Sequence, residues 1–252
     1  MSLSPERKRR ILALLEARGG MRTRELAREL GVSEATVRRD LTELAREGRV
    51  ERTHGGALPL RMGTATEPPF DLKAKRKVAE KERIATAALR HVKDGSTIIL
   101  DSGTTALALA RKLAERPVTV IALDLKVAEA LARGRAEVWV VGGRARNGLF
   151  SLVGPWAENL LAEVHADLFF LGADAVDEEA VTNATLEEAE VKRRAHAAAQ
   201  RTILVADHTK FGRRALARVL PLEALAGVVT DRGAKDFLPV LKEKVPGFID
   251  LV

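Results

Sequence analysis

The N-terminal part of the chain repeats its apolar residues at a helical spacing and separates them with glycine and capping residues. A first helix is expected over residues 4–18, because its apolar residues share one face and two glycines follow. A short second helix is expected between a capping Thr23 and Gly31, and a third between a capping Ser33 and Gly48. Helices this closely spaced predict a helix-turn-helix.

The third of these helices has two faces of different chemistry. At about 100° per residue, Val37, Leu41 and Leu44 fall on one face and are expected in the core. The outward and flanking positions carry small, hydroxyl and arginine side chains, which suit a helix that enters a DNA major groove. Asp40 lies nearer the core-facing side, so we expect it to pair with an arginine or a backbone amide of the protein.

The segment Arg49–Ala57 alternates in polarity and contains two glycines, which predicts a short β-hairpin, or wing. Arg49, Arg52 and His54 on this wing could contact backbone phosphates. The candidate DNA-contacting residues are therefore Ser33, Ala35, Thr36, Arg38, Arg39, Thr42, Arg46, Arg52 and His54.

From Gly95 onward, short apolar and β-branched runs alternate with longer helical patterns. Strands are expected at 97–100, 118–122, 138–141, 168–171, 202–206 and 228–230. Helical stretches between most of them predict a mostly parallel, Rossmann-like sheet covered by helices. The fold class is therefore α/β, with a small winged helix-turn-helix domain at 1–58, a linker rich in proline and small residues at 59–71, and a larger domain at 72–252.

A buried strand, a small-residue loop and a helix follow one another between residues 97 and 113. Gly103 lets a ligand approach the backbone, and Ser102, Thr104 and Thr105 supply hydroxyls. The helix N-terminus adds unpaired amides and a favourable dipole, so the loop is a candidate phosphate site. An ordinary strand-to-helix turn with a threonine cap has the same pattern.

Other polar residues are expected where the carboxyl ends of the strands meet: Asp101, Asp124, Gly142, Gly143, Asp174 and Asp207, with Lys210 just after the last. Ligands of such sheets bind at this edge, where carboxylates suit sugar hydroxyls and a lysine could meet a phosphate or a carboxylate. Each aspartate alone has the alternative role of turn former or helix cap. These five sites at one edge, with Gly142 and Gly143 counted as one, together favour a pocket.

The composition, with 46% hydrophobic and 31% charged residues among 252, is that of a soluble globular protein. The absence of cysteine excludes disulfides, thiolate metal sites and cysteine nucleophiles, and favours the cytoplasm. No stretch approaches the about 20 apolar residues of a membrane span, so no membrane partner is expected. The net charge is +7, and residues 1–57, with 13 basic and 9 acidic side chains, carry more than half of it, which favours a polyanionic partner.

The histidines and aromatic residues indicate no further site. The histidines show no metal-ligand spacing, so neither a metal nor another cofactor is expected. Trp139, Trp156, Phe169 and Phe170 lie in apolar runs and are expected in the core rather than as a stacking platform.

The N-terminal motifs resemble those of a known family. Within residues 7–59, the stretches Ser33–Leu41 (SEATVRRDL) and Thr53–Ala57 (THGGA) are similar to the winged helix-turn-helix of DeoR-family bacterial repressors. This resemblance implies binding to double-stranded operator DNA. A winged helix used for protein contacts is the alternative, which the outward arginines disfavour.

The C-terminal part resembles the sensor domain of the same family. The motifs that carry the resemblance are Asp101–Thr105, Gly142–Gly143, Ser151–Pro155, Leu186–Lys192 and Ala206–Gly212. The resemblance implies a fold related to ribose-5-phosphate isomerase and a phosphorylated sugar or sugar metabolite as effector. It also implies that the loop 102–105 takes the phosphate and that Asp207 and Lys210 lie in the same pocket.

The resemblance also places Glu188, Glu190 and Lys192 in the sensor signature, although salt bridges within a helix would explain them as well. Two segments depart from the family pattern. Leu123–Asp124 stands where many members carry Thr-Asn, and Asn183–Thr185 replaces a proline-containing loop. A carboxylate after the second strand would repel phosphate and accept from hydroxyls, so the effector's identity does not carry over.

The candidate effector residues are Asp101, Ser102, Gly103, Thr104, Thr105, Asp124, Gly142, Gly143, Asp174, Glu190, Lys192, Asp207 and Lys210. The sequence thus predicts a repressor of sugar-metabolism genes, not an enzyme, whose operator binding a phosphorylated sugar relieves. A homo-oligomer, a dimer or higher, is expected because one winged helix touches too little DNA.

Two other functions stay open at this point. A sugar-phosphate isomerase-like enzyme with an appended DNA-binding domain would draw its general base from Asp101, Asp124, Asp174, Glu190 or Asp207. The lysine-bearing, glycine-rich loop of the isomerase has no evident counterpart in this chain. A DNA-architectural protein with an inert scaffold fits the charge but leaves the pocket unexplained.

Overall fold

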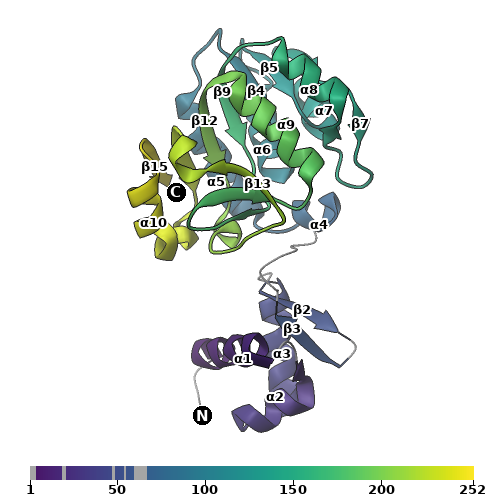
Figure 1. The fold of residues 1–252 in the computed structure, drawn as a ribbon, viewed down its shortest axis with the longest axis vertical. Helices are drawn as coiled ribbons and strands as arrows, with labels where there is room; N and C mark the ends of the chain where they lie inside the picture. The colour runs from purple at the N-terminus through teal and green to yellow at the C-terminus, as the bar shows by residue number, and fades with distance from the viewer. Residues whose placement is uncertain (1–3, 19–20, 47–48, 54, 60–66) are drawn as a thin grey trace. The chain divides into compact units, whose positions relative to one another are not determined.

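The chain folds as two units, residues 1–63 and 64–252. The computed structural model describes residues 4–18, 21–46, 49–53, 55–59 and 67–252 (Figure 1). The predicted linker at 59–71 falls partly outside the described residues, and its last part, 67–71, belongs to the second unit. Among the described residues, no helix is both long and apolar enough to cross a membrane.

The described part of the first unit consists of helices and a small antiparallel sheet. The helices are α1 (Ser4–Arg18), α2 (Thr23–Leu30) and α3 (Glu34–Arg46), and the strands are β1 (Met21–Arg22), β2 (Val50–Thr53) and β3 (Gly56–Pro59). The predicted hairpin forms from β2 and β3, and β1, which was not predicted, adds to β3. Gly56 permits this pairing, because a Cβ there would lie 2.2 Å from the carbonyl oxygen of Met21.

The turn between α2 and α3 follows the predicted chemistry, with one correction. Gly31 ends α2 in the left-handed conformation, with φ of 66°, and Ser33 Oγ caps α3 by accepting from an amide of its first turn at 3.2 Å. Thr23, predicted to cap α2, is instead its first residue. The Arg22 amide before it donates to Glu25 Oε2 at 2.9 Å, so a glutamate closes the start of the helix.

The core face of α3 is confirmed, since Val37, Leu41 and Leu44 are fully buried. Asp40 beside this face is also buried. Arg7 of α1 donates to it twice, from Nε to Oδ2 at 2.5 Å and from Nη2 to Oδ1 at 3.1 Å. This is the internal arginine partner expected for Asp40, and it ties α1 to α3.

The second unit is organised around a seven-stranded sheet in which all neighbouring strands are parallel. The order is β15-β14-β12-β9-β4-β5-β6. The strands are β4 (Thr97–Leu100), β5 (Thr119–Ala122), β6 (Glu137–Val140), β9 (Ala166–Leu171), β12 (Ala199–Val205), β14 (Gly227–Thr230) and β15 (Phe248–Leu251). Every strand predicted after Gly95 lies in this sheet, and the edge strand β15 was not predicted.

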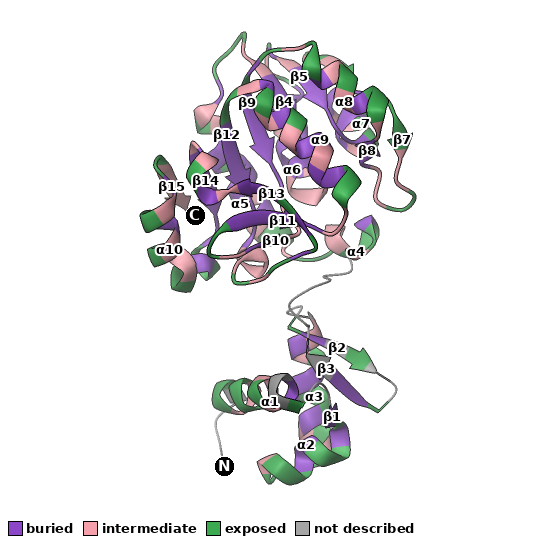
Figure 2. Ribbon diagram, in the orientation of Figure 1, coloured by how far each residue is buried: buried purple, intermediate pink, exposed green. Residues whose placement is uncertain are grey.

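Helices cover both faces of this sheet, because successive strand residues alternate between the faces (Figure 2). Along β9, Leu168 and Phe170 pack with α5 (Val78–Ala88), α6 (Thr104–Leu113) and α7 (Leu125–Leu131). Phe169 and Leu171 pack on the other face with α8 (Pro155–Ala162), α9 (Leu186–Ala197) and α10 (Leu238–Lys244). A parallel sheet buried on both faces is the arrangement that its continuous apolar runs predicted.

Smaller elements complete the second unit. A three-stranded sheet contains β10 (Ala175–Val176), β11 (Ala180–Asn183) and β13 (Ala217–Pro221), and a hairpin contains β7 (Arg144–Ala145) and β8 (Leu152–Val153). The short helices are α4 (Phe70–Ala74), η1 (Leu89–His91), η2 (His208–Lys210), η3 (Leu222–Ala224) and η4 (Arg232–Phe237). These strands were not predicted, because most are too short to show an alternating pattern.

The expectation that both tryptophans lie in the core is wrong. Trp139 is 52% exposed and Trp156 is 77% exposed, whereas Phe169 and Phe170 are fully buried. Trp139 lies on β6, the edge strand of the sheet, and its indole N–H donates to Glu137 Oε1 at 3.1 Å. An apolar run on an edge strand has neighbours on one side only, so its pattern does not distinguish it from a central strand.

The Arg7–Asp40 contact predicts a loss of stability in the first unit. Replacing Asp40 with asparagine should cost about 1–3 kcal/mol, because the buried carboxylate that accepts both hydrogen bonds from Arg7 loses its charge. Hydrogen exchange of the α1–α3 amides should therefore accelerate about tenfold to hundredfold. Glu43→Gln is the control, since its carboxylate is 42% exposed where it meets Lys8, and exchange should hardly change. Equal effects of the two variants would contradict this role of Asp40.

Candidate functional site

Carboxylates from neighbouring strands meet at one edge of the seven-stranded sheet. Asp101 follows β4, Asp124 follows β5, Asp174 follows β9 and Asp207 follows β12, and these four strands are adjacent in the sheet. The structure therefore brings together the four aspartates that the sequence placed at the carboxyl edge.

A buried ion pair joins helix α9 to this edge. Lys192 Nζ lies 2.9 Å from Asp101 Oδ2, and both side chains are almost inaccessible to solvent. The same ammonium donates to Gly172 O at 3.1 Å and to Asn183 Oδ1 at 3.0 Å. Burial alone would lower the pKa of Lys192, but the surrounding carboxylates, Asp101 foremost, outweigh it and hold the pKa above its usual value. The charged Lys192 therefore joins α9 to Asp101, Gly172 and Asn183 at this edge.

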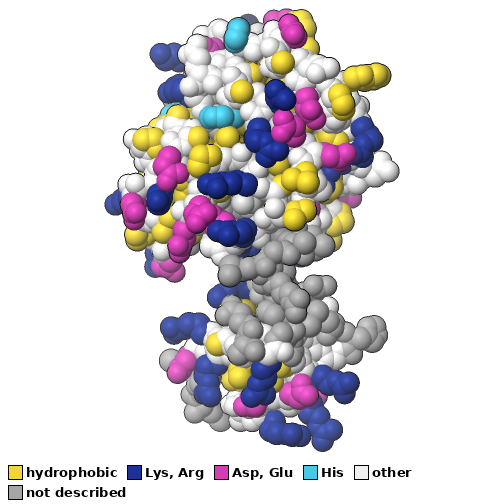
Figure 3. Space-filling model, viewed as in Figure 1, with side chains coloured by type: hydrophobic (Ala, Val, Ile, Leu, Met, Phe, Trp, Pro, Cys, Tyr) yellow, Lys and Arg dark blue, Asp and Glu magenta, His cyan; other side chains and the backbone are white. Residues whose placement is uncertain are grey.

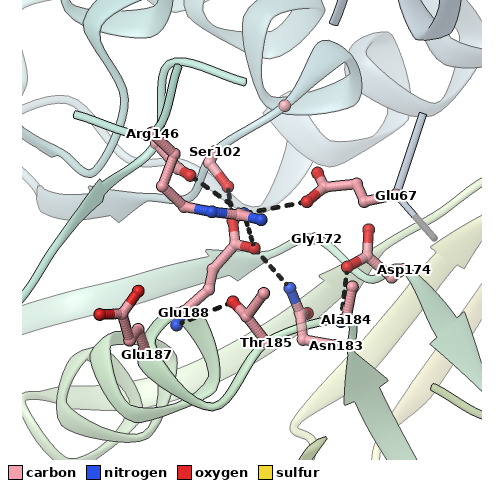
Figure 4. Close-up of polar contacts among 12 residues, drawn as sticks. Glu67, Ser102, Arg146, Gly172, Asp174, Asn183, Ala184, Thr185, Glu187 and Glu188 are labelled. Atoms are coloured by element: carbon pink, nitrogen blue, oxygen red, sulfur yellow. Dashed lines mark hydrogen bonds and ion pairs between the residues drawn. The ribbon is translucent and has the colours of Figure 1, made fainter. Parts of the chain in front are cut away.

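Glu188, one turn before Lys192 on α9, accepts from three sides (Figure 4). Its Oε1 accepts from Ser102 Oγ at 2.9 Å, and its Oε2 accepts from Asn183 Nδ2 at 2.9 Å and Arg146 Nη1 at 2.5 Å. The candidate effector residues did not include Glu188. The spacing of four residues from Lys192 was the signal that could have added it, because such residues share a helix face.

Arg146 connects Glu188 to Glu67, which lies outside the large sheet and its helices. Arg146 lies in the loop between β7 and β8, and its Nη1 also donates to Glu67 Oε2 at 2.9 Å. Glu67 in turn pairs with Lys73 of α4. The acidic partners outweigh the effect of burial and raise the pKa of Arg146 above its ordinary value. No local pattern predicts these contacts, because the residues lie far apart in the sequence.

Three of these carboxylates form a tight acidic group. Glu67, Asp174 and Glu188 each place one oxygen within 4.8 Å of the others. Such a group could attract a cation, but Arg146 already bonds to two of its members. The guanidinium therefore supplies there the positive charge that a metal ion would supply.

The loop 102–105 at the N-terminus of α6 is partly engaged and partly free. Gly103 has φ of 94°, and a Cβ built on it would meet nothing within 4 Å. The Ser102 hydroxyl is committed to Glu188, whereas the half-buried side chains of Thr104 and Thr105 have no hydrogen bond to any described residue. The loop thus leaves two threonine hydroxyls without a hydrogen bond to any described residue at the N-terminus of α6.

Most of the aspartates at this edge accept hydrogen bonds from backbone amides of turns and helix ends. Asp124 is fully buried and caps α7, its Oδ1 accepting from two amides of the first turn at 2.7 and 3.1 Å, while its Oδ2 accepts from the Gly103 amide at 3.3 Å. Asp207 Oδ1 caps η2 by accepting from the Thr209 amide at 3.1 Å. Asp101 accepts from the amides of Ser102 and Gly172 at 2.7 Å each. The alternative role of helix cap or turn former thus describes these three.

Asp174 differs from the other edge aspartates. It is half-buried, and its Oδ2 accepts from the Ala184 amide at 2.9 Å. Burial would raise the pKa of Asp174, but nearby lysines, Lys210 foremost, hold it below its usual value. Asp174 is therefore an ionised carboxylate on the accessible side of the edge.

Two half-buried cations lie near Asp174. Neither Lys210 nor Arg213 makes a side-chain hydrogen bond or ion pair with another residue that the structure describes. Burial lowers the pKa of both, and the charge of Asp174 opposes that shift. Cations that are partly desolvated and lack a contacting counter-charge favour the approach of an anion. Arg213 was not among the candidate effector residues.

Other candidates lie elsewhere or have other roles. Glu190 pairs with Arg193 at 2.7 Å and Arg194 at 3.1 Å on the partly exposed side of α9, so it does not join Glu188 and Lys192. Gly142 and Gly143 are exposed and have φ of 74° and 92°. A Cβ on Gly143 would lie 2.6 Å from Val153 O, so backbone packing accounts for a glycine there.

The candidate DNA-contacting residues of the first unit lie on the solvent side of α3 and on the wing. Ser33, Ala35, Arg38, Arg39, Thr42 and Arg52 are exposed, and Thr36 is half-buried. Arg52 Nη1 of β2 donates to Thr42 Oγ1 at 3.1 Å and to Arg38 O at 3.2 Å, which fixes the wing strand beside α3. His54 and the side chain of Arg46 lie outside the described residues. Figure 3 shows Lys and Arg side chains on the visible surface of this unit.

One chain combines a winged helix-turn-helix unit with an α/β unit whose sheet edge carries charges and hydroxyls. This combination is typical of a DNA-binding regulator with a ligand-sensing domain. The chain belongs to the DeoR family. The DeoR-like helix-turn-helix domain matches residues 7–60, and the DeoR C terminal sensor domain matches residues 76–232.

Two relatives, a transcriptional regulator and a repressor, agree with this assignment. The HTH-type transcriptional regulator GlpR of Haloferax volcanii is 35% identical over 231 residues, which cover 91% of this chain and 90% of that protein. The lactose phosphotransferase system repressor of Staphylococcus aureus is 32% identical over 240 residues, which cover 94% and 96%. A ribose 5-phosphate isomerase of Methanocaldococcus jannaschii aligns with a TM-score of 0.40 at 21% identity, over 52% of this chain and 53% of that one. By family, this chain is a DNA-binding transcriptional regulator.

Lys81 of α5 connects the edge to α4. It is 6% exposed, and its Nζ donates to Lys73 O at 2.7 Å and to Arg76 O at 2.6 Å. Burial lowers the pKa of Lys81 to about 8, although the Asp207 carboxylate opposes the shift. The ammonium is thus held in place by carbonyl oxygens at the cost of desolvation.

This pKa predicts a rise of stability with pH. Because unfolded lysine has a pKa of about 10.4, the unfolded state binds more protons than the folded state between about pH 8 and pH 10.4. The free energy of unfolding should therefore rise by about 1–3 kcal/mol across that window, relative to the Lys81→Met variant. Urea unfolding followed by circular dichroism at both ends of the window measures the difference. Identical pH profiles for the two proteins would show that Lys81 is not desolvated in the fold.

Proposed function

We propose that this regulator represses sugar-metabolism genes and that a phosphorylated sugar bound at the carboxyl edge of the sheet relieves its operator binding. The observation that carries the proposal is the loop 102–105 at the N-terminus of α6, where the hydroxyls of Thr104 and Thr105 bond to no described residue and a Cβ on Gly103 would meet nothing within 4 Å. A phosphate accepts hydrogen bonds from such donors and is attracted by the helix dipole. A relative named as a lactose phosphotransferase system repressor supports a sugar as the effector class.

The charges around the loop suit a ligand with an anionic group and hydroxyls. Lys210 and Arg213 attract the anion, and the ionised Asp174 accepts hydrogen bonds from sugar hydroxyls. Asp101, Asp124, Asp207 and Lys192 shape the edge by holding its loops rather than by contacting the sugar. We assign Gly142, Gly143 and Glu190 no contact with the effector.

The same geometry argues against isomerase chemistry. A general base needs a carboxylate with free lone pairs near the substrate and a pKa close to the working pH. Asp101, Asp124 and Asp207 are committed to backbone amides. Asp174 is accessible, but its pKa lies below its usual value, which makes it a weak base. The chain therefore senses its ligand without converting it.

The DNA side of the proposal rests on α3 and the wing. The recognition surface comprises Ser33, Ala35, Thr36, Arg38, Arg39, Thr42 and Arg52, together with Arg46 and His54. Arginines on such a helix read guanine edges or clamp phosphates. One winged helix covers a single half-site, so we propose that the protein binds paired half-sites as a homo-oligomer in the cytoplasm.

The first test is an operator titration with and without pentose and hexose phosphates. An inducing sugar phosphate should weaken operator binding by a factor of about 5–150, and operator should weaken binding of that sugar phosphate by the same factor. Thr104→Val combined with Thr105→Val should abolish the preference for the phosphorylated sugar over the free sugar. If the operator affinity is the same with and without a bound sugar phosphate, the proposal is refuted. Turnover of an aldose phosphate to a ketose phosphate would favour the enzyme instead.

The second test concerns the recognition helix. Arg39 is exposed and makes no side-chain hydrogen bond or ion pair with another described residue, so Arg39→Gln should weaken operator binding by about 1–3 kcal/mol if it reads a base, with relaxed specificity at one position. If it contacts a phosphate, affinity for all sequences should fall alike. Arg201→Gln, which removes an exposed charge from the second unit, is the control. Unchanged DNA binding by Arg39→Gln would remove Arg39 from the interface.

A further inference from the structure

Arg146 links the candidate effector pocket to the beginning of the second unit. Its Nη1 donates to Glu188 Oε2 at 2.5 Å and to Glu67 Oε2 at 2.9 Å. The other oxygen of Glu188 accepts from Ser102 in the loop 102–105. One carboxylate therefore separates Arg146 from the loop proposed to bind the effector's anion (Figure 4).

The segment Glu67–Ala74 is held on the loop between β7 and β8 at three points. Glu67 bonds to Arg146, the Phe70 amide donates to Gly148 O at 2.9 Å, and the Phe70 ring meets the Phe150 ring edge-to-face at 5.4 Å. Glu67 is only 7% exposed at its side chain. The segment thus inserts a buried carboxylate between two cations, Arg146 and Lys73.

The two carboxylates that share Arg146 are not held equally. Glu188 belongs to the packed helix α9 and also accepts from Ser102 and Asn183. Glu67 depends on Arg146 and on Lys73 of its own segment. An anion that enters next to Arg146 adds negative charge to a group that already contains three carboxylates within 4.8 Å. Of these, Glu188 belongs to α9 and Asp174 follows β9, whereas Glu67 precedes the short helix α4.

We propose that Arg146 and Lys73 extend the anion site of the loop 102–105, that Glu67 occupies this part of the site as an internal anion, and that the phosphate of the effector, bound to the loop, displaces Glu67. This inference rests on the proposed function, because it takes the loop 102–105 as the place where the effector binds. Displacement breaks the Glu67–Arg146 contact and loosens the segment Glu67–Ala74 from the loop that carries Gly148 and Phe150. Glu67 directly follows residues 60–66, the stretch of chain that leads to the first unit, so the displaced segment is the one through which binding acts on the DNA-binding unit.

The test uses the full chain and inorganic phosphate as the probe. Glu67→Gln keeps the shape of the side chain but removes the competing charge, so phosphate affinity should rise about tenfold, as for the loss of one charged competitor. Arg146→Gln should lower phosphate affinity. Glu187→Gln is the matched control, because that carboxylate meets Arg144 of the same hairpin at 2.6 Å on the exposed surface. Phosphate affinity of this control should stay within about twofold.

A second measurement needs no variant. Hydrogen exchange of the Phe70 amide, which is bonded to Gly148 O, should accelerate when phosphate saturates the wild-type protein. If phosphate binds and Thr104→Val with Thr105→Val weakens it, but neither Glu67→Gln nor Phe70 exchange responds, the displacement is wrong and the proposed pocket stands. A lower affinity in Glu67→Gln would make Glu67 a ligand of the anion and would also overturn the inference. Failure of phosphate and of every sugar phosphate to bind any variant overturns both proposals.

Discussion

The ion pair between Lys192 and Asp101 is the constraint on which the rest of the carboxyl edge of the large sheet depends. Two buried charges are costly unless each is fully hydrogen-bonded, and here the ammonium also binds Gly172 O and Asn183 Oδ1 while the carboxylate accepts backbone amides. This set of bonds joins α9 to the loops after β4 and β9 and to β11. Once α9 is fixed in this rotation, Glu188 must face the edge, because it lies one turn earlier on the same face.

The parallel sheet explains why acidic residues gather at the edge and why few of them are free to bind a ligand. Each strand end must turn into a helix whose first amides lack partners, and an aspartate satisfies them. Asp124 and Asp207 are used in this way. In the proposed function, recognition falls to the hydroxyls of Thr104 and Thr105, which bond to no described residue, and to the ionised Asp174, which accepts a single backbone amide. The position of a residue after a strand thus identifies the edge but does not identify the ligand contacts.

The sequence predicted what local patterns encode. Continuous apolar runs identified six of the strands in the large sheet, and the helical spacing of Val37, Leu41 and Leu44 identified the core of the first unit. Strands as short as β7 and β8 contain too few residues to show a pattern and were not predicted. Trp139 on the edge strand β6 was wrongly expected in the core. The contacts of Arg146 with Glu67 and Glu188 bridge separations of 79 and 42 residues. Such contacts arise from the tertiary fold and leave no periodic signal.

The charge balance of the pocket gives a physical reason for coupling between ligand and conformation. Around Arg146 the positive charges are already matched by carboxylates of the chain itself, so a bound phosphate cannot simply be added without repulsion. Either a carboxylate gains a proton or one moves away. The lowered pKa of Asp174 disfavours the first route for that carboxylate, and the proposed displacement of Glu67 is an example of the second. Because Glu67 belongs to the segment that precedes α4 and not to the sheet, the proposed displacement would free that segment from the loop that carries Gly148 and Phe150 and would leave the sheet and α9 in place.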